Sequence, residues 1–199
     1  MMYSRQRDVK ISISGIVFLI LAAASLVLPM RWLMAAVLAA GVHELCHVLA
    51  ISLLHGEIEG IKIHPFGVVM MLHPMEPGKE IVCALAGPLG GAALLLFLRV
   101  YPELALCACV HSVYNMLPIP GLDGARIISG LFVLCGIHTD AAQKFKVFCH
   151  VVRVVLLVSL VGYTILYGQL DDGLILLMAD VLRTIIRKIY CKDTFFAVQ

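Results

Sequence analysis

The chain has 199 residues, of which 61% are hydrophobic and 14% are charged, and its mean hydropathy is +0.99. Soluble domains are about half apolar and about a quarter charged, so this composition excludes an ordinary soluble domain and indicates a polytopic membrane protein. The net charge of +2 gives no sign of a nucleic-acid partner. The length fits a single domain embedded in the lipid bilayer, residues 1–199.

Apolar runs of spanning length follow one another along the chain. The first, from Ile11 to Leu28, comes after three basic residues and is predicted to be an uncleaved span, because it is longer than the apolar core of a signal peptide. The second runs from Trp32 to Leu54. The predicted fold is all-α and polytopic, with about six transmembrane helices, the last four at residues 81–98, 103–117, 147–167 and 174–189. The apolar segment from Ile127 to Ile137 is assigned to none of them.

The connection between the second and third spans has a different character. Residues from Ile58 to Leu72 are rich in β-branched side chains and are interrupted at Pro65-Phe66-Gly67. This pattern predicts two short strands around a turn. We therefore expect a short membrane-associated β-hairpin at this place.

The second span contains the sequence His43-Glu44-Leu45-Cys46-His47. On a helix, His43 and His47 lie one turn apart on the same face, which is the spacing that lets two imidazoles hold one zinc ion. Glu44 lies beside them, where a carboxylate can accept a proton from water. Ionisable groups inside a membrane span are costly and mark function, so a chance pair of histidines is disfavoured.

A catalytic zinc takes three protein ligands and keeps a fourth position open. Asp123 is the best third ligand on geometry. A straight helix would carry it past the depth of the histidines, but Pro118 and Pro120 forbid a straight helix. A break after Asn115 lets the chain return to that depth.

Other polar residues in the spans have simpler explanations. Asp180 has Arg183 three residues later, which indicates a local ion pair. His111 lies one turn before Asn115 and either supports the metal ligands or is a hydrogen-bonded core histidine. Close helix packing, more than chemistry, is predicted for Gly87, Gly90 and Gly91.

Basic residues are distributed unevenly between the two sides of the predicted membrane domain. The positive-inside rule places both termini, and with them the histidine pair, towards the cytoplasm. The opposite side holds only Arg31 and Arg99. The connections on the cytoplasmic side contain Lys62, Lys79, Lys144 and Lys146.

Three motifs together resemble the site-2 protease family, the intramembrane zinc metalloproteases of peptidase family M50. They are residues 43–47, Ala-Gly-Pro-Leu at 86–89, and residues 115–124, which are similar to the family's Asn-x-x-Pro and Leu-Asp-Gly motif. They occur in the family's order within residues 31–126. The resemblance implies hydrolysis of a peptide bond in or near a membrane segment of a tethered protein substrate. It also implies one zinc per chain, held by His43, His47 and Asp123, with Glu44 as general base.

Within the family, the six-span layout and the turn at residues 65–67 look most like the sporulation branch. Its bacterial members process a membrane-tethered sigma-factor precursor. Ala125 stands where the family's Leu-Asp-Gly-Gly motif has its second glycine, and neither a PDZ nor a CBS domain is recognisable in the sequence. The resemblance implies a multi-pass protein of a bacterial cell membrane that cleaves a pro-sigma factor or signalling precursor, with a regulatory membrane protein as partner.

Substrate binding or transition-state support is assigned to Asn115, Pro118, Phe66 and Gly67. For Asn115 the alternative is a cap at the helix end. An exposed edge of the hairpin can add an extended substrate as a further strand; the alternative is a hairpin that only closes the cytoplasmic mouth.

Two other functions stay open. A divalent-metal transporter would usually show repeated halves, and an inactive relative serving as a membrane scaffold would be expected to lose a ligand or the glutamate.

Overall fold

The computed structural model describes residues 10–64, 67–119 and 121–137 without interruption, and then 143–145, 147–149, 151–152, 154–155 and 158–159. The chain divides into two units, Met1–His150 and Val151–Gln199. The helices and strands described below all belong to the first unit. The predicted span at 174–189, with Asp180, lies outside the described residues, as does most of the span predicted at 147–167.

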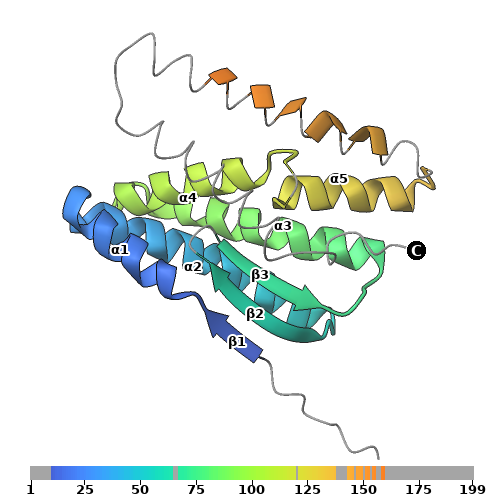
Figure 1. The fold of residues 1–199 in the computed structure, drawn as a ribbon, viewed down its shortest axis with the longest axis horizontal. Coiled ribbons are helices and arrows are strands. Elements are labelled where there is room, and N and C mark those ends of the chain that lie inside the picture. The colour runs from blue at the N-terminus through green and yellow to red at the C-terminus, as the bar shows by residue number, and fades with distance from the viewer. Residues whose placement is uncertain are drawn as a thin grey trace, which may run out of the picture. The chain divides into compact units, whose positions relative to one another are not determined.

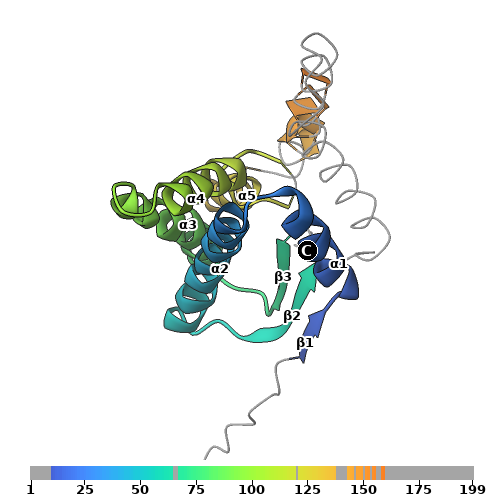
Figure 2. The ribbon, with the colours of Figure 1, turned by 90° about the vertical axis from the view of Figure 1, so that its left-hand side faces the viewer.

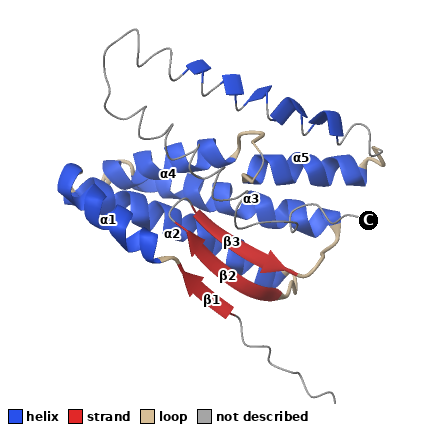
Figure 3. Ribbon diagram, in the orientation of Figure 1, coloured by secondary structure: helices blue, strands red, loops and turns tan. Residues whose placement is uncertain are grey.

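Five helices make up most of the first unit (Figures 1 and 3). The helices α2 and α3, the latter with its 3-10 extension η1, are long and apolar enough to cross a membrane, and α1 is a shorter apolar helix. These two helices lie where the second and third spans were predicted, whereas six spans are not shown by the described residues. The bounds are α1 Gly15–Val27, α2 Met30–Leu53, α3 Pro77–Ala93, η1 Leu94–Phe97, α4 Pro102–Asn115 and α5 Asp123–Leu134.

A three-stranded sheet lies beside the helices, in the order β1-β2-β3. The predicted hairpin is confirmed as β2 (Ile58–His64) and β3 (Gly67–Leu72), which pair antiparallel. Strand β1 (Lys10–Ile13) pairs parallel with β2. Of the three strands, β3 lies nearest α2 and α3 and β1 farthest from them, while β1 leads directly into α1 (Figures 1 and 2).

The prediction of a helix from residue 11 was wrong at its start. Residues 11–14 alternate Ile and Ser, a period of two that suits a strand, and the neighbouring β2 edge offers them backbone partners. The Ser14 N–H donates to the carbonyl of Ile63 at 3.0 Å, and helix α1 begins only at Gly15.

Small residues on the buried faces bring the helices close together. On α2 every fourth residue is buried, which places both histidines on the face that packs into the protein: Ala35, Ala39, His43, His47 and Ile51. On α3 the buried residues include Ala84, Gly87 and Gly91. A Cβ at Gly91 would overlap the hydroxyl of Ser112 on α4. Large aliphatic side chains on the same helices are exposed instead, as expected where lipid surrounds the protein.

The break between α4 and α5 occurs where the prolines predicted it. Helix α4 ends at Asn115, the chain turns through Pro118 and Gly121, whose φ is 96°, and α5 begins at Asp123. The segment that the sequence left unassigned is therefore mainly helix α5. That helix closes with the two hydrogen bonds of a Schellman motif, Ile137 N–H to Phe132 and Gly136 N–H to Val133, and Gly136 has a φ of 64°.

Candidate metal centre

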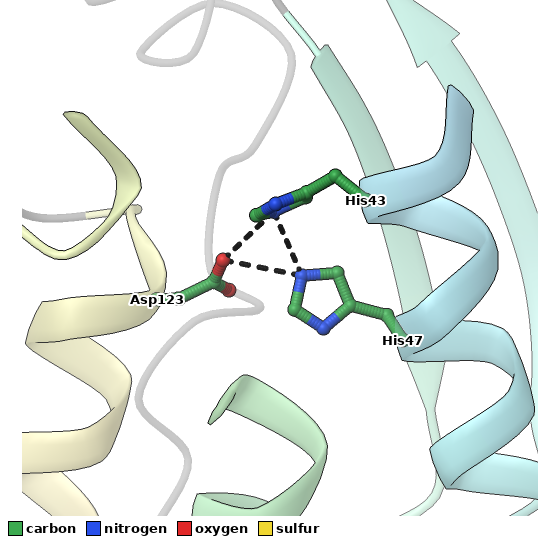
Figure 4. A group of neighbouring side chains, drawn as sticks. All are labelled: His43, His47 and Asp123. Atoms are coloured by element: carbon green, nitrogen blue, oxygen red, sulfur yellow. Dashed lines mark hydrogen bonds and ion pairs between the residues drawn. The ribbon is translucent and has the colours of Figure 1, made fainter. Parts of the chain in front are cut away.

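Three buried side chains from two helices meet at one point (Figure 4). The Nε2 atoms of His43 and His47 are 3.1 Å apart, and each is 3.1 Å from Oδ2 of Asp123. All three residues are at most 6% exposed. The structure thus brings together the three predicted metal ligands, although Asp123 comes 80 residues after His43 and 76 residues after His47. The break after α4 returns Asp123 to the depth of the histidines.

With both imidazoles neutral and Asp123 ionised, the two Nε2 atoms and Oδ2 have too few protons for the contacts they make. The Nδ1–H of His47 donates to the carbonyl of Cys83 at 2.7 Å, so the Nε2 of a neutral His47 carries a lone pair. Only His43 can then supply a proton, and one proton serves one of the three contacts. The remaining contacts join acceptor to acceptor, which is unfavourable in a buried site. A bound cation removes this conflict.

The spacing fits a tetrahedral divalent metal. Bonds of about 2.0–2.1 Å to histidine nitrogen and carboxylate oxygen separate neighbouring ligand atoms by about 3.3 Å, close to the 3.1 Å seen here. Among the described residues, His43, His47 and Asp123 are the group that can hold a metal ion. Three ligands leave a fourth position for water or substrate.

Helix α3 is shaped around this centre. A Cβ on Gly87 would overlap Nε2 of His47 and lie 2.8 Å from Cε1 of His43. The neighbouring Pro88 is inside the helix and has no N–H to donate to the carbonyl of Ala84, one turn before it. The carbonyl of Cys83, one residue earlier, accepts the proton of His47. For Gly87, close helix packing was predicted more than a role in chemistry, and the structure shows that the absence of a side chain there also makes room for the ligands.

Two charged groups lie around the three ligands. Glu44 is close enough to His43, His47 and Asp123 to interact electrostatically with each, and it reaches the backbone of Val68 in β3. On the other side, Nη1 of Arg126 is 3.9 Å from Oδ1 of Asp123, and its Nε is 3.9 Å from Glu80 on α3. The sequence reasoning missed Arg126, although its position three residues after Asp123 on a helix was a signal.

The predicted substrate-binding residues are placed less directly. The Asn115 Nδ2 donates to the carbonyl of His111 at 3.0 Å, a contact within α4. Pro118 lies in the turn between α4 and α5, and Gly67, with a φ of 131°, begins β3. Phe66 lies outside the described residues. Their roles in substrate binding stay predictions.

No protein-family model and no curated protein sequence matches the chain. Among solved structures, the site-2 protease from Methanocaldococcus jannaschii matches with a TM-score of 0.66, over 100% of this chain and 98% of that chain. The chain has the fold of a site-2 protease. The sequence identity is 16%, so the likeness lies in the arrangement of the backbone. It agrees with the resemblance carried by the three motifs.

Proposed function

We propose that the protein is an intramembrane zinc metalloprotease. The observation that carries this proposal is the buried set of His43, His47 and Asp123, with Glu44 beside it, in a chain with the site-2 protease fold. Two imidazoles and one carboxylate are a ligand set that suits zinc. A zinc bound there would activate water near neutral pH and polarise the substrate carbonyl.

The protein's own groups divide the remaining work. Glu44 accepts a proton from the attacking water and returns it to the leaving amine. His47 is held in the tautomer that leaves Nε2 free for the metal, because its Nδ1–H donates to Cys83 at 2.7 Å. The burial of the three ligands, each at most 6% exposed, limits the access of bulk water.

The sheet offers a place for an extended substrate. A transmembrane helix must open locally before its peptide bonds can be attacked, and strand addition to a sheet edge holds a peptide extended. One edge of β2 is already paired with β1, and the other with β3. The outer edge of β3 lies on the side of the helices (Figure 2), and Glu44 already reaches its backbone at Val68.

The alternation of a strand identifies which groups on this edge are available. If the Val68 N–H points to Glu44, it points away from β2. The N–H of Met70, two residues later, then points in the same direction. Val69 lies opposite Lys62 and faces β2. The substrate backbone therefore pairs with Val68 and Met70, beside the metal ligands. We favour this role over the alternative in which the hairpin only closes the mouth of the site.

The proposed substrate is a membrane-tethered protein, cleaved on the cytoplasmic side of a multi-pass bacterial membrane protein. The uneven distribution of lysines supports this orientation. The sequence around residues 65–67 supports a pro-sigma factor or a related signalling precursor, with a regulatory membrane protein controlling access to the site.

Comparison of the wild type with Glu44→Gln in cells tests the function. Quantitative proteomics of membrane and soluble fractions should detect fragments that require wild-type protein and are absent with Glu44→Gln. Glu57→Gln, which neutralises a carboxylate whose side chain is 71% exposed on the way into the hairpin, should cleave as the wild type does. Identical fragment patterns with wild type and Glu44→Gln would refute the protease assignment and favour a scaffold or a metal transporter.

A further inference from the structure

The two histidine ligands are oriented in different ways. The ring of His47 is fixed by the hydrogen bond from Nδ1 to the carbonyl of Cys83, the usual arrangement for a metal-binding histidine. The Nδ1 of His43 is buried and has no hydrogen-bond partner among the described residues. Apart from the contacts of its Nε2 at the centre, the orientation of His43 therefore depends on packing.

Two aromatic rings supply that packing. The ring of His47 lies 4.7 Å from the ring of His43 at 83°, and the ring of His111 lies 4.6 Å from it at 90°. Both are edge-to-face contacts at the short end of the favourable range. Since His47 is itself a ligand, His111 is the aromatic ring among the described residues that packs on His43 from another helix.

The part of α4 that carries His111 is firmly placed. Ala105 and Ala108 are at most 1% exposed, and Ser112 lies where a Cβ on Gly91 of α3 would overlap it. The carbonyl of His111 accepts a hydrogen bond from Asn115 at 3.0 Å. A ring on such a rigid segment can hold a neighbouring ring in one orientation.

We propose that His111 is a positioning residue for the metal centre, whose ring holds His43 so that Nε2 points at the metal. The proposal rests on the metal site of the proposed function. It assigns the role to the shape of the ring, so another planar aromatic side chain should replace His111, whereas a branched aliphatic side chain should not. The ring touches a ligand and not the reacting atoms.

Zinc affinity of the full-length protein in detergent tests this role, measured by competition with a chromogenic chelator. His111→Leu should raise the dissociation constant for zinc by about 10–100-fold, the usual effect of removing a group that orients a ligand. His111→Phe should stay within about threefold of the wild type, because it keeps the edge-to-face contact. Ser112→Ala, the next residue on α4, is the control for altered packing and should bind zinc as the wild type does.

A second measurement separates positioning from general stability. With cobalt(II) in place of zinc, the visible absorption bands of His111→Phe should match those of the wild type, while those of His111→Leu should shift because the His43 ring has turned. Unchanged affinity in His111→Leu, or a loss in His111→Phe as large as in His111→Leu, would overturn the proposal. Failure of the wild type itself to bind zinc would refute the proposed function instead.

Discussion

Gly87, which has no side chain, provides a sharp test of the metal centre, because a methyl group added there would overlap the metal-binding histidines. In Gly87→Ala the new Cβ would overlap Nε2 of His47 and lie 2.8 Å from Cε1 of His43. The two rings must turn or α3 must move away. Either movement separates the nitrogens from the position at which they bind the metal.

The size of the effect follows from the cost of overpacking. An added methyl group in a well-packed core costs about 1–3 kcal/mol. If the metal-bound arrangement bears this cost and the metal-free protein relaxes, zinc affinity falls by roughly 5–150-fold, since every 1.4 kcal/mol is about tenfold. Peptide cleavage at limiting zinc should fall in the same proportion.

Two other glycines of α3 give matched controls. A Cβ on Gly90 would overlap the sulfur of Cys46, which is not a proposed ligand, and a Cβ on Gly78 meets nothing within 4 Å. Gly90→Ala should therefore lower thermal stability while zinc affinity stays close to that of the wild type. Gly78→Ala should leave zinc affinity unchanged and should not lower thermal stability, because alanine favours a helix more than glycine does.

The assay is zinc titration of the purified protein in detergent against a competing chelator, together with thermal unfolding of the metal-free forms. The expected order of zinc affinity places Gly87→Ala well below the other two variants. If Gly87→Ala binds zinc as tightly as Gly78→Ala does, the space beside Gly87 is not the space of the metal ligands, and the account of helix α3 is wrong.

Three further predictions follow from the surroundings of the centre. Arg126→Met removes the ion pair between Nη1 of Arg126 and Oδ1 of Asp123, which are 3.9 Å apart. It should weaken zinc binding about two- to fivefold, the value of a partly exposed ion pair. Arg99→Met, a change to an exposed arginine, should not, and equal affinities in the two variants would rule out a role for Arg126. Met70→Pro should leave zinc content unchanged but slow cleavage roughly two- to tenfold, the value of one hydrogen bond to the substrate. Val69→Pro should instead destabilise the sheet, because the N–H of Val69 faces β2. Undiminished cleavage by Met70→Pro would show that the β3 edge does not bind the substrate. Free zinc at 1,000 times its dissociation constant should stabilise the metal-free wild type by about 4 kcal/mol, or roughly 8–16 °C in the unfolding midpoint, and an equal shift in Asp123→Ala would show that zinc acts elsewhere.

Much of the metal centre could be predicted because its determinants are local. The spacing of His43 and His47 fixes their common face on any helix. The prolines after Asn115 allow only a broken helix, and this break brings Asp123 back to the histidines. The hairpin followed from its β-branched residues and the turn at 65–67. In each case a few neighbouring residues carry the information.

The features that escaped prediction depend on partners far away in the sequence. Strand β1 forms because β2, about 50 residues later, offers an edge. The residues near position 11 do not indicate which strand they pair with. The acceptor for His47 is the backbone carbonyl of Cys83, which any residue type would supply. The ring of His111 was recognised as a candidate, but its contact with His43 required the packing of α4 against α2.

The zinc content of purified wild type and Asp123→Ala, measured by plasma mass spectrometry after dialysis, tests the central claim most directly. Wild type and Glu44→Gln should each carry one zinc per chain, because Glu44 is proposed to act on water and not to bind the metal. Asp123→Ala should lose most of its zinc while remaining folded. Full zinc occupancy in Asp123→Ala would contradict the account, since the centre would then not be the one formed by His43, His47 and Asp123.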